Sequence, residues 1–386
     1  MATTTLEKTA APTNAVATGA EWLAAIAAIA PSISARPATP LMSYAKVFSE
    51  GSKLYLQGYD WEVSATTEVA EDCAPISPFL VPYKWLTTTL KTLLGKDKAS
   101  LVGLGVESGK VVLRCDGYEI PVEGSSVADY PNVPATGRVF AEVDSAKLKP
   151  AMARVATTAS TDHTLPILTG LHVDAHGAGL DICATDRYRL AYDHVSASVQ
   201  HDRKFLVGAK TWAAVAKNVS GGDLMFTDVP TNEYAIGIIT GKTIYTVVEI
   251  QGDYPKIRSL IGEGHSTVVE LDRAKLLAIT TVAGKLTERN LPVRLSISST
   301  GAMVVADPDA KSPLAAANWV AGPHSDGWIV SFNPAYLLDA IKAFTTDMIR
   351  FSQQTLPKPA VFTEAGVAAE DNEAFRHMIM PVRLPA

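Results

Sequence analysis

The chain has 386 residues, of which 47% are hydrophobic and 19% charged, as is typical of a soluble protein with packed cores. Its formal net charge of −6 at pH 7 disfavours a nucleic-acid partner on charge alone, but leaves open how the charge is distributed. Cys73, Cys115 and Cys183 are far apart and odd in number. This argues against a disulfide framework or a zinc site and predicts a cytoplasmic, reducing location.

The beginning of the chain is expected to be unstructured. Residues 1–19 are rich in Ala and Thr and read as a disordered tail. The apolar run 22–30 is short and follows Glu21 rather than a basic segment, so it predicts a helix and not a signal peptide. No apolar stretch reaches the roughly 18 residues that a membrane helix needs, so no membrane partner is expected.

The chain then repeats itself with a fixed period. The segment FLVPYK at 79–84 returns as FLVGAK at 205–210, which is 126 residues later. The same offset relates GYD at 58–60 to ATD at 184–186, and LPI at 165–167 to LPV at 291–293. A period of this length is the size of a domain. The expected organisation is therefore a tail followed by three domains of like architecture: 1–19, 20–136, 137–263 and 264–386.

Within each copy the predicted elements follow one plan. An apolar helix opens the copy, strand pairs follow around glycine turns, a second helix comes next, and further strands close the copy. Opening helices are predicted at 21–30, at 146–156 and around 274–279, and second helices from about Lys84, Lys210 and Pro334. Two helices beside antiparallel strands make each copy an α+β domain with its helices on one face of the sheets.

The second helices carry lysines at recurring positions. Lys84 and Lys91 are seven residues apart, which places them two turns apart on one helix face, and Lys210 and Lys217 repeat this spacing. A single such pair is most often a solvated helix face. Because the pairs recur, the alternative is a shared basic surface that holds a phosphate backbone without reading its sequence.

The sequence contains no pattern that indicates catalysis. There is no GxSxG, no Walker loop and no repeated cluster of acids, so no enzyme activity, metal or cofactor is expected. Asp60 and Asp186 occupy equivalent places in two copies beside predicted hairpins. Each is interpreted as a turn-stabilising aspartate rather than a catalytic one.

Three segments together resemble a known family. They are LPILTG at 165–170, ATDRYRLA at 184–191 and MIMPVRL at 378–384. They are similar to the bacterial DNA polymerase III beta subunit, the sliding clamp, and the likeness runs from about residue 20 to the end. It implies three tandem clamp domains that form a head-to-tail homodimeric ring around duplex DNA, acting as a processivity factor in DNA replication.

The resemblance also implies DNA contacts and partners. Its DNA-facing positions fall on Arg36, Lys84, Lys91, Lys210 and Lys217. The implied partners are double-stranded DNA bound independently of sequence, the DNA polymerase catalytic subunit, other proteins with a clamp-binding motif, and an ATP-driven clamp loader. Tethering raises the effective concentration of the polymerase at the primer end, so such a ring needs no chemistry of its own.

The second implied site is an apolar cleft for client peptides between the second and third domains. The matching positions are Leu168, Thr185, Tyr188, Leu190, Pro255, Leu260, Met378, Met380, Pro381, Val382 and Arg383. Met suits a site that admits several sequences, because it re-packs easily. Without the family, the C-terminal segment that holds Met380 is better interpreted as a terminal strand that closes the third domain's core.

The chain also departs from the family. Arg187 stands where some members have glycine, which implies a narrower pocket entrance, and Pro385-Ala386 extend beyond the usual last leucine. The first and third domains match their counterparts only loosely. The alternative function is therefore a diverged clamp paralogue that serves as a peptide-binding scaffold without encircling DNA.

Overall fold

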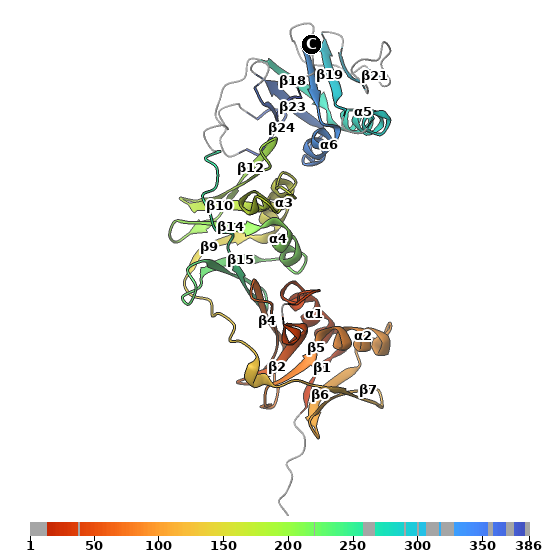
Figure 1. The fold of residues 1–386 in the computed structure, drawn as a ribbon, viewed down its shortest axis with the longest axis vertical. Coiled ribbons are helices and arrows are strands. Elements are labelled where there is room, and N and C mark those ends of the chain that lie inside the picture. Colours follow the sequence, from red (N-terminus) through yellow and green to blue (C-terminus); the bar gives the residue numbers. More distant parts are fainter. Residues whose placement is uncertain are drawn as a thin grey trace, which may run out of the picture. The chain divides into compact units, whose positions relative to one another are not determined.

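The structure is a computed structural model that divides into two compact units. The first comprises Met1–Ser145 and Lys210–Glu249, and the second comprises Ala146–Ala209 and Ile250–Ala386. Each unit combines antiparallel strands with helices, which confirms the predicted α+β class (Figure 1). The residues that the structure describes are 14–37, 39–219, 221–257, 267–288, 291–298, 301–305, 316–317, 328–353, 358–367 and 374–382.

The first unit is built on two antiparallel sheets. The smaller has the order β1-β6-β7-β8, with β1 Ala15–Thr18, β6 Leu101–Glu107, β7 Lys110–Cys115 and β8 Tyr118–Glu123. In the larger sheet the strands of this unit follow the order β9-β15-β16-β17-β4-β3-β2-β5. Their bounds are β9 Val139–Asp144, β15 Asp223–Asp228, β16 Ala235–Thr240, β17 Thr243–Val248, β4 Val63–Ala70, β3 Lys53–Tyr59, β2 Tyr44–Glu50 and β5 Phe79–Pro82.

The second unit also contains two antiparallel sheets. One has the order β14-β10-β11-β12-β25-β24-β23-β18, with β14 Arg203–Gly208, β10 Gly170–His176, β11 Gly179–Thr185, β12 Arg189–Ser196, β25 Arg376–Ile379, β24 Ala360–Glu364, β23 Met348–Gln353 and β18 Thr267–Asp272. The other has the order β21-β20-β19-β22, with β21 Ala316–Ala317, β20 Gly301–Val305, β19 Val293–Ser298 and β22 Trp328–Phe332. A two-residue strand, β13, covers Ser198–Val199.

In the first unit, α1 (Gly19–Ile29) lies against β4 and beside α2 (Tyr83–Leu94), as Figure 1 shows. The helix begins at a capping box in which the Thr18 hydroxyl accepts from Glu21 N and the Glu21 carboxylate accepts from Thr18 N. Trp22 is fully buried, and its Nε1 donates to the carbonyl of Val102 at 3.2 Å. This apolar face is what makes the predicted opening helix stable.

The remaining helices follow the predicted plan. The bounds are α3 Ser145–Ala156, α4 Ala209–Ala216, α5 Arg273–Leu286 and α6 Pro334–Lys342. On the predicted opening helix α3, an apolar stripe of Leu148, Met152 and Val155 is fully buried. In the second unit α5 packs on α6, as α1 packs on α2 in the first.

The structure confirms the 126-residue period at the level of single residues. Strands β2, β3 and β4 begin and end 126 residues before β10, β11 and β12, respectively. The 3₁₀ turns Pro40–Ser43 and Pro166–Thr169 obey the same offset. The sequence repeat therefore corresponds to a repeat of backbone structure.

Two expectations are wrong in detail. Ala15–Thr18 are not part of a tail: they form β1, which pairs with β6, and the side chains of Ala15 and Ala17 are buried. Residues 1–13 lie outside the described part of the chain. Lys217 is not on the second helix of its copy, because α4 ends at Ala216 and Lys217 follows in a turn.

Candidate functional site

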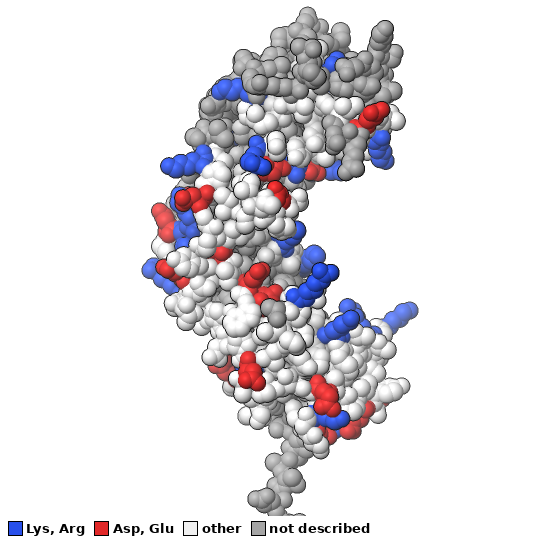
Figure 2. Space-filling model, viewed as in Figure 1, with Lys and Arg blue, Asp and Glu red and all other residues white. Residues whose placement is uncertain are grey.

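The predicted basic residues lie on the surface of the first unit. Lys84 and Lys91 on α2, Lys210 on α4, and Lys217 just after α4 are all exposed, as is Arg36 in the loop between α1 and β2. Figure 2 shows basic side chains gathered beside α2 and α4. A helix face with this pattern presents ammonium groups to solvent rather than to the core.

A hollow on this surface brings together lysines from two segments that are distant in sequence. Lys91, Lys98 and Lys217 line a cavity of about 590 Å³, whose apolar wall includes Ile26 and Leu94. Lys91 and Lys217 form no ion pair with the described residues, so their charge is not neutralised locally. Lys84, Lys210 and Arg36 lie outside this hollow. Lys98 was not predicted, although it continues the seven-residue spacing of Lys84 and Lys91.

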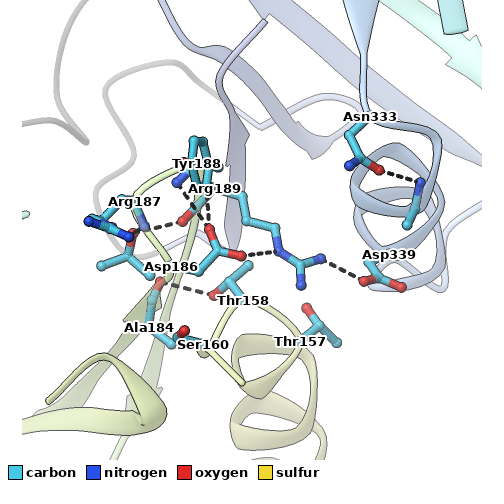
Figure 3. Close-up of polar contacts among 12 residues, drawn as sticks. Thr157, Thr158, Ser160, Ala184, Asp186, Arg187, Tyr188, Arg189, Asn333 and Asp339 are labelled. Carbon is cyan, nitrogen blue, oxygen red and sulfur yellow. Dashed lines mark hydrogen bonds and ion pairs between the residues drawn. The ribbon is translucent and has the colours of Figure 1, made fainter. Parts of the chain in front are cut away.

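In the second unit, a tight turn joins β11 to β12 and is stabilised by Asp186, as the sequence predicted. The Asp186 Oδ1 accepts from the backbone N–H groups of Tyr188 and Arg189, each at 3.0 Å (Figure 3). The Thr185 hydroxyl donates to the Arg189 carbonyl at 2.7 Å and accepts from Arg187 N at 3.1 Å. These bonds hold the backbone of the turn, which carries the side chains of Arg187, Tyr188 and Arg189.

Arg189 connects the turn to α6. Its Nε donates to Asp186 Oδ2 at 2.9 Å, and its Nη1 donates to Asp339 Oδ2 at 2.6 Å (Figure 3). The guanidinium also lies 4.4 Å from the centroid of the Tyr336 ring. Because both ends of the fork and its face are occupied, Arg189 acts as a fixed strut between the turn and the helix.

An apolar pocket lies beside this turn. Its volume is about 220 Å³, and its floor is formed by Leu190, Ile257 and Met378, which belong to one buried cluster. Met380 lies at the rim with 39% of its surface exposed, and its N–H donates to the Tyr188 carbonyl at 2.8 Å. A pocket with an apolar floor and few polar groups suits a hydrophobic side chain of a ligand.

The structure assembles most, but not all, of the predicted cleft residues. Six of them line the pocket: Thr185, Tyr188, Leu190, Pro255, Met378 and Met380. Leu168 is buried elsewhere, and Val382 lines a separate hollow, where its N–H donates to the Ser331 carbonyl. Pro381 does not line the pocket, and Leu260 and Arg383 lie outside the described residues.

Four lining residues were not predicted as site residues: Arg187, Arg189, Ile257 and Pro359. The two arginines lie within the ATDRYRLA segment, so their neighbours Thr185 and Tyr188 were a usable signal. No such signal existed for Ile257 and Pro359. They follow Pro255 and precede β24, respectively, and only the fold brings them to the turn.

Burial decides the protonation of two groups near the pocket. Burial, followed by the nearby Asp181 and Asp174 carboxylates, raises the pKa of the Cys183 thiol to about 12, so this thiol remains protonated at neutral pH. Burial lowers the pKa of His377 to about 3, with a smaller contribution from the Arg189 charge. The neutral imidazole is therefore the native form of His377.

Within the described ranges, no three His, Cys, Asp or Glu side chains are grouped so that they could hold a metal ion. In the same part of the chain, no helix is both long and apolar enough to span a membrane.

Comparison with known families matches two models. Residues 142–256 match the central domain of the DNA polymerase III beta subunit, and residues 258–383 match its C-terminal domain. Together the two matches cover more than half of the chain. The pocket residues Thr185 and Leu190 fall within the first match, and Met378 and Met380 within the second.

Similar curated proteins are named beta sliding clamps. The Micrococcus luteus protein is 32% identical over 275 residues, which cover 70% of this chain and 87% of that protein. The Streptomyces coelicolor protein is 29% identical over 371 residues, covering 93% of this chain and 96% of that one. A protein of Streptomyces muensis named beta sliding clamp homolog GriR is 26% identical over 359 residues, covering 92% and 95%.

Solved structures of sliding clamps have the same fold. The Pseudomonas aeruginosa clamp bound to griselimycin superimposes with a TM-score of 0.86 at 21% identity, covering 97% of this chain and all of that one. The Thermotoga maritima beta subunit gives a TM-score of 0.84 at 17% identity, covering 96% of this chain and all of that one.

Proposed function

The chain belongs to the DNA polymerase III beta subunit family, the beta sliding clamps, and from this premise we propose that it encircles duplex DNA and tethers a replicative polymerase. In this proposal the chain folds as three clamp domains, 20–136, 137–263 and 264–386. Two copies join head to tail into a closed ring in the cytoplasm. The ring is a non-catalytic processivity factor, and an ATP-driven loader opens it onto DNA.

The lysine-lined hollow is the observation that best supports DNA binding. Lys91 on α2, Lys98 after α2 and Lys217 after α4 line this hollow together, and Lys84 adds another exposed ammonium group on α2. These groups would attract phosphates without reading bases. The overall charge of −6 is no obstacle, because closure of the ring rather than tight contact would retain it on DNA.

The pocket beside the Asp186 turn is the proposed client site. Its apolar floor would take one hydrophobic side chain of a client peptide, and Met380 would adapt to that side chain. The griselimycin-bound relative supports the view that clamps of this fold offer a site for small ligands. One such pocket per chain would give one docking site per subunit.

The first experiment tests the ring. Light scattering after size exclusion should give a dimer at micromolar concentration. A loader-assembled complex should stay on nicked circular plasmid and slide off after the plasmid is linearised, because only a topological link depends on the ends of DNA. A monomer that is not retained on the circle would overturn the proposed encirclement.

The second experiment tests the basic surface. Lys91→Glu combined with Lys217→Glu should lower retention on DNA several-fold at low salt and make its dependence on salt shallower, because fewer phosphate contacts release fewer counterions. Lys110→Glu is a matched control, since Lys110 is exposed in the same unit but pairs with Glu123 on β8. Equal retention of all variants would contradict a role for this surface.

A second candidate function is a paralogue that binds peptides without encircling DNA. One relative of similar identity carries the name of a clamp homologue rather than a clamp, which favours this alternative. It predicts normal peptide binding. It also predicts that neither linearisation of the plasmid nor Lys91→Glu changes the amount of protein retained on DNA.

A further inference from the structure

The apolar pocket contains two arginines, and only one of them is held by acidic partners. Arg189 is bound by Asp186, Asp339 and the Tyr336 ring. Arg187 also lines the pocket and is exposed, yet among the described residues it forms no ion pair. An unpaired guanidinium beside an apolar floor leaves five hydrogen-bond donors available to a ligand.

The backbone of Arg187 is held in an unusual conformation. Its φ is +79°, in the left-handed region that non-glycine residues rarely adopt. The Thr185 hydroxyl accepts from its N–H, and Asp186 holds the two following N–H groups. Such a conformation persists only where surrounding contacts determine it, and these are common at ligand sites.

The internal repeat gives an independent indication of where this side chain is aimed. The residue 126 positions earlier, Trp61, has nearly the same φ of +77° in an equivalent turn. Its ring packs at 5.3 Å, with a tilt of 52°, on the ring of Tyr59, which is the counterpart of Thr185. In the first unit the side chain at this position therefore lies over the residue two positions earlier, and in the second unit Arg187 lines the pocket together with Thr185.

Asp162 interacts electrostatically with Arg187 but forms no ion pair with it. The Asp162 Oδ1 accepts from Thr164 N at 2.9 Å and from its hydroxyl at 2.7 Å. These bonds to Thr164 are the largest cause of the lowered pKa of Asp162, ahead of any arginine. Among the described residues Arg187 thus forms no ion pair, and its guanidinium donors remain available at the pocket.

We propose that Arg187 is a specificity-determining residue that selects client peptides carrying an aspartate or glutamate side chain next to the hydrophobic anchor. This inference rests on the proposed client site. The anchor fills the floor of Leu190, Ile257 and Met378, and the carboxylate pairs with the Arg187 fork above it. Arg189 takes no part in the selection, because its donors are already used.

The size of the effect follows from exposure. Arg–carboxylate pairs gain from bidentate geometry, but a pair at an exposed rim is screened by solvent and salt. We expect about a fivefold preference for an acidic peptide over its neutral twin at low salt, shrinking at about 0.3 M salt.

The test uses two fluorescein-labelled, C-terminally amidated peptides in which leucines and a phenylalanine flank either one Asp or one Asn. Amidation removes the terminal carboxylate, so that only the side chain differs. Fluorescence anisotropy with the full-length protein should show tighter binding of the Asp peptide. Arg187→Gln should abolish the preference by weakening binding of the Asp peptide more than that of the Asn peptide, and Arg187→Lys should retain part of the preference.

A charge exchange distinguishes pairing from a structural role. Arg187→Glu should bind the Asp peptide more weakly than wild type, and should prefer a third peptide with Lys in place of Asp. Arg187→Gly, which accepts a positive φ without strain, shows whether the turn itself matters. Arg36→Gln, an exposed arginine of the other unit, is the matched control and should change nothing.

The outcomes separate the two proposals. If wild type binds both peptides and Arg187→Gln keeps the same preference, the role of Arg187 is overturned and the client site stands. If wild type binds neither peptide, the proposed client site fails, and the inference fails with it.

Discussion

The Asp60 turn of the first unit and the Asp186 turn of the second have the same backbone conformation, but different side chains pack behind them. Asp60 Oδ1 accepts from the N–H groups of Glu62 and Val63, two and three residues later, as Asp186 Oδ1 does from Tyr188 and Arg189. In both turns the residue after the aspartate has a positive φ, although neither Trp61 nor Arg187 is glycine.

The strands that pair beyond these turns also correspond. Val248 N donates to the Glu62 carbonyl at 2.8 Å, and Met380 N donates to the Tyr188 carbonyl at the same distance. Val248 and Met380 are equally exposed, at 39%. A pocket rim therefore exists in outline in both units.

What differs is the side chains that occupy the space behind the rim. Behind the first turn, Tyr59 packs with Leu80 and Tyr130 in one buried cluster, and the Trp61 ring lies on Tyr59. Behind the second turn, the small Thr185 takes the place of Tyr59, and an apolar pocket is present. Main-chain hydrogen bonds therefore give both turns the same backbone. The volume of the side chains behind each turn decides whether a pocket is present.

The largest expected effect comes from removing the buried aromatic ring behind the Asp60 turn. Tyr59→Thr copies the second turn into the first and removes a buried ring from the Leu80–Tyr130 cluster. We expect a loss of about 3 kcal/mol in the free energy of unfolding, measured by urea denaturation, because a cavity replaces aromatic contacts. A loss below about 1 kcal/mol would mean that the cluster collapses to fill the space. Thr185→Ser is the control in the second turn, since it retains the hydroxyl.

The next effect concerns pH and the strand beside each turn. His377 on β25 is paired with Ala191, as Tyr245 on β17 is paired with Ala65. Tyr245 Oη donates to the Ala28 carbonyl at 2.8 Å, whereas neither ring nitrogen of His377 has a hydrogen-bond partner among the described residues. Because burial depresses the folded pKa of His377 to about 3, unfolding takes up a proton below the ordinary histidine pKa.

Stability that depends on His377 is therefore fully present above about pH 6.5 and is lost as pH falls toward 3. We expect the free energy of unfolding to fall by about 2–3 kcal/mol between pH 7 and pH 4.5 through this group. His377→Phe should remove that part of the pH dependence in denaturant titrations. An unchanged pH profile in His377→Phe would show that the imidazole is not the group responsible.

A smaller effect is expected from the strut between the Asp186 turn and α6. Arg189→Val copies Val63, the counterpart in the first turn, and leaves the half-buried Asp186 without its cation. The free energy of unfolding should fall by about 2 kcal/mol, because a partly buried carboxylate loses its partner. Asp339→Asn, at the more exposed end of the strut, should cost less than about 1 kcal/mol. The reverse order would place the important contact at α6 instead.

The smallest expected effect concerns peptide affinity and distinguishes Met380 from its counterpart Val248. Met380→Ala should weaken binding of a leucine-containing peptide by roughly tenfold, since about 1.4 kcal/mol of apolar contact is lost, with little change in stability. Val248→Ala, equally exposed at the corresponding position, should leave peptide affinity as it is. Equal losses in both variants would break the comparison, because they would place a second binding site at the first turn.

Local pattern was sufficient to predict much of the fold. The period of 126 residues follows from matched segments such as 79–84 and 205–210, and matched segments fold into strands with matched bounds. The role of Asp60 and Asp186 was equally predictable, since an aspartate that caps a turn bonds to N–H groups two and three residues away. Six pocket residues were predicted from the resemblance to the family, and all but Pro255 lie in the short segments that carry it.

Contacts between distant segments were not predictable from local pattern. Ala15–Thr18 form a strand because they pair with Leu101–Leu104, and nothing near Ala15 in the sequence reveals that partner. The Arg189–Asp339 ion pair joins residues 150 positions apart, so the sequence near either residue does not predict its partner. Lys217 is not on the predicted helix because α4 ends one residue earlier. The seven-residue spacing of the lysines does not determine where the helix ends.

The repeat, the α+β class and the turn aspartates follow from the sequence alone, because these depend on periodicity and on bonds between near neighbours. The residue types of the pocket followed from the resemblance to a known family. Only the tertiary structure decided which lysines share a hollow, which arginine is already bound and which remains available. Those properties depend on distances between segments that the chain brings together only when it folds.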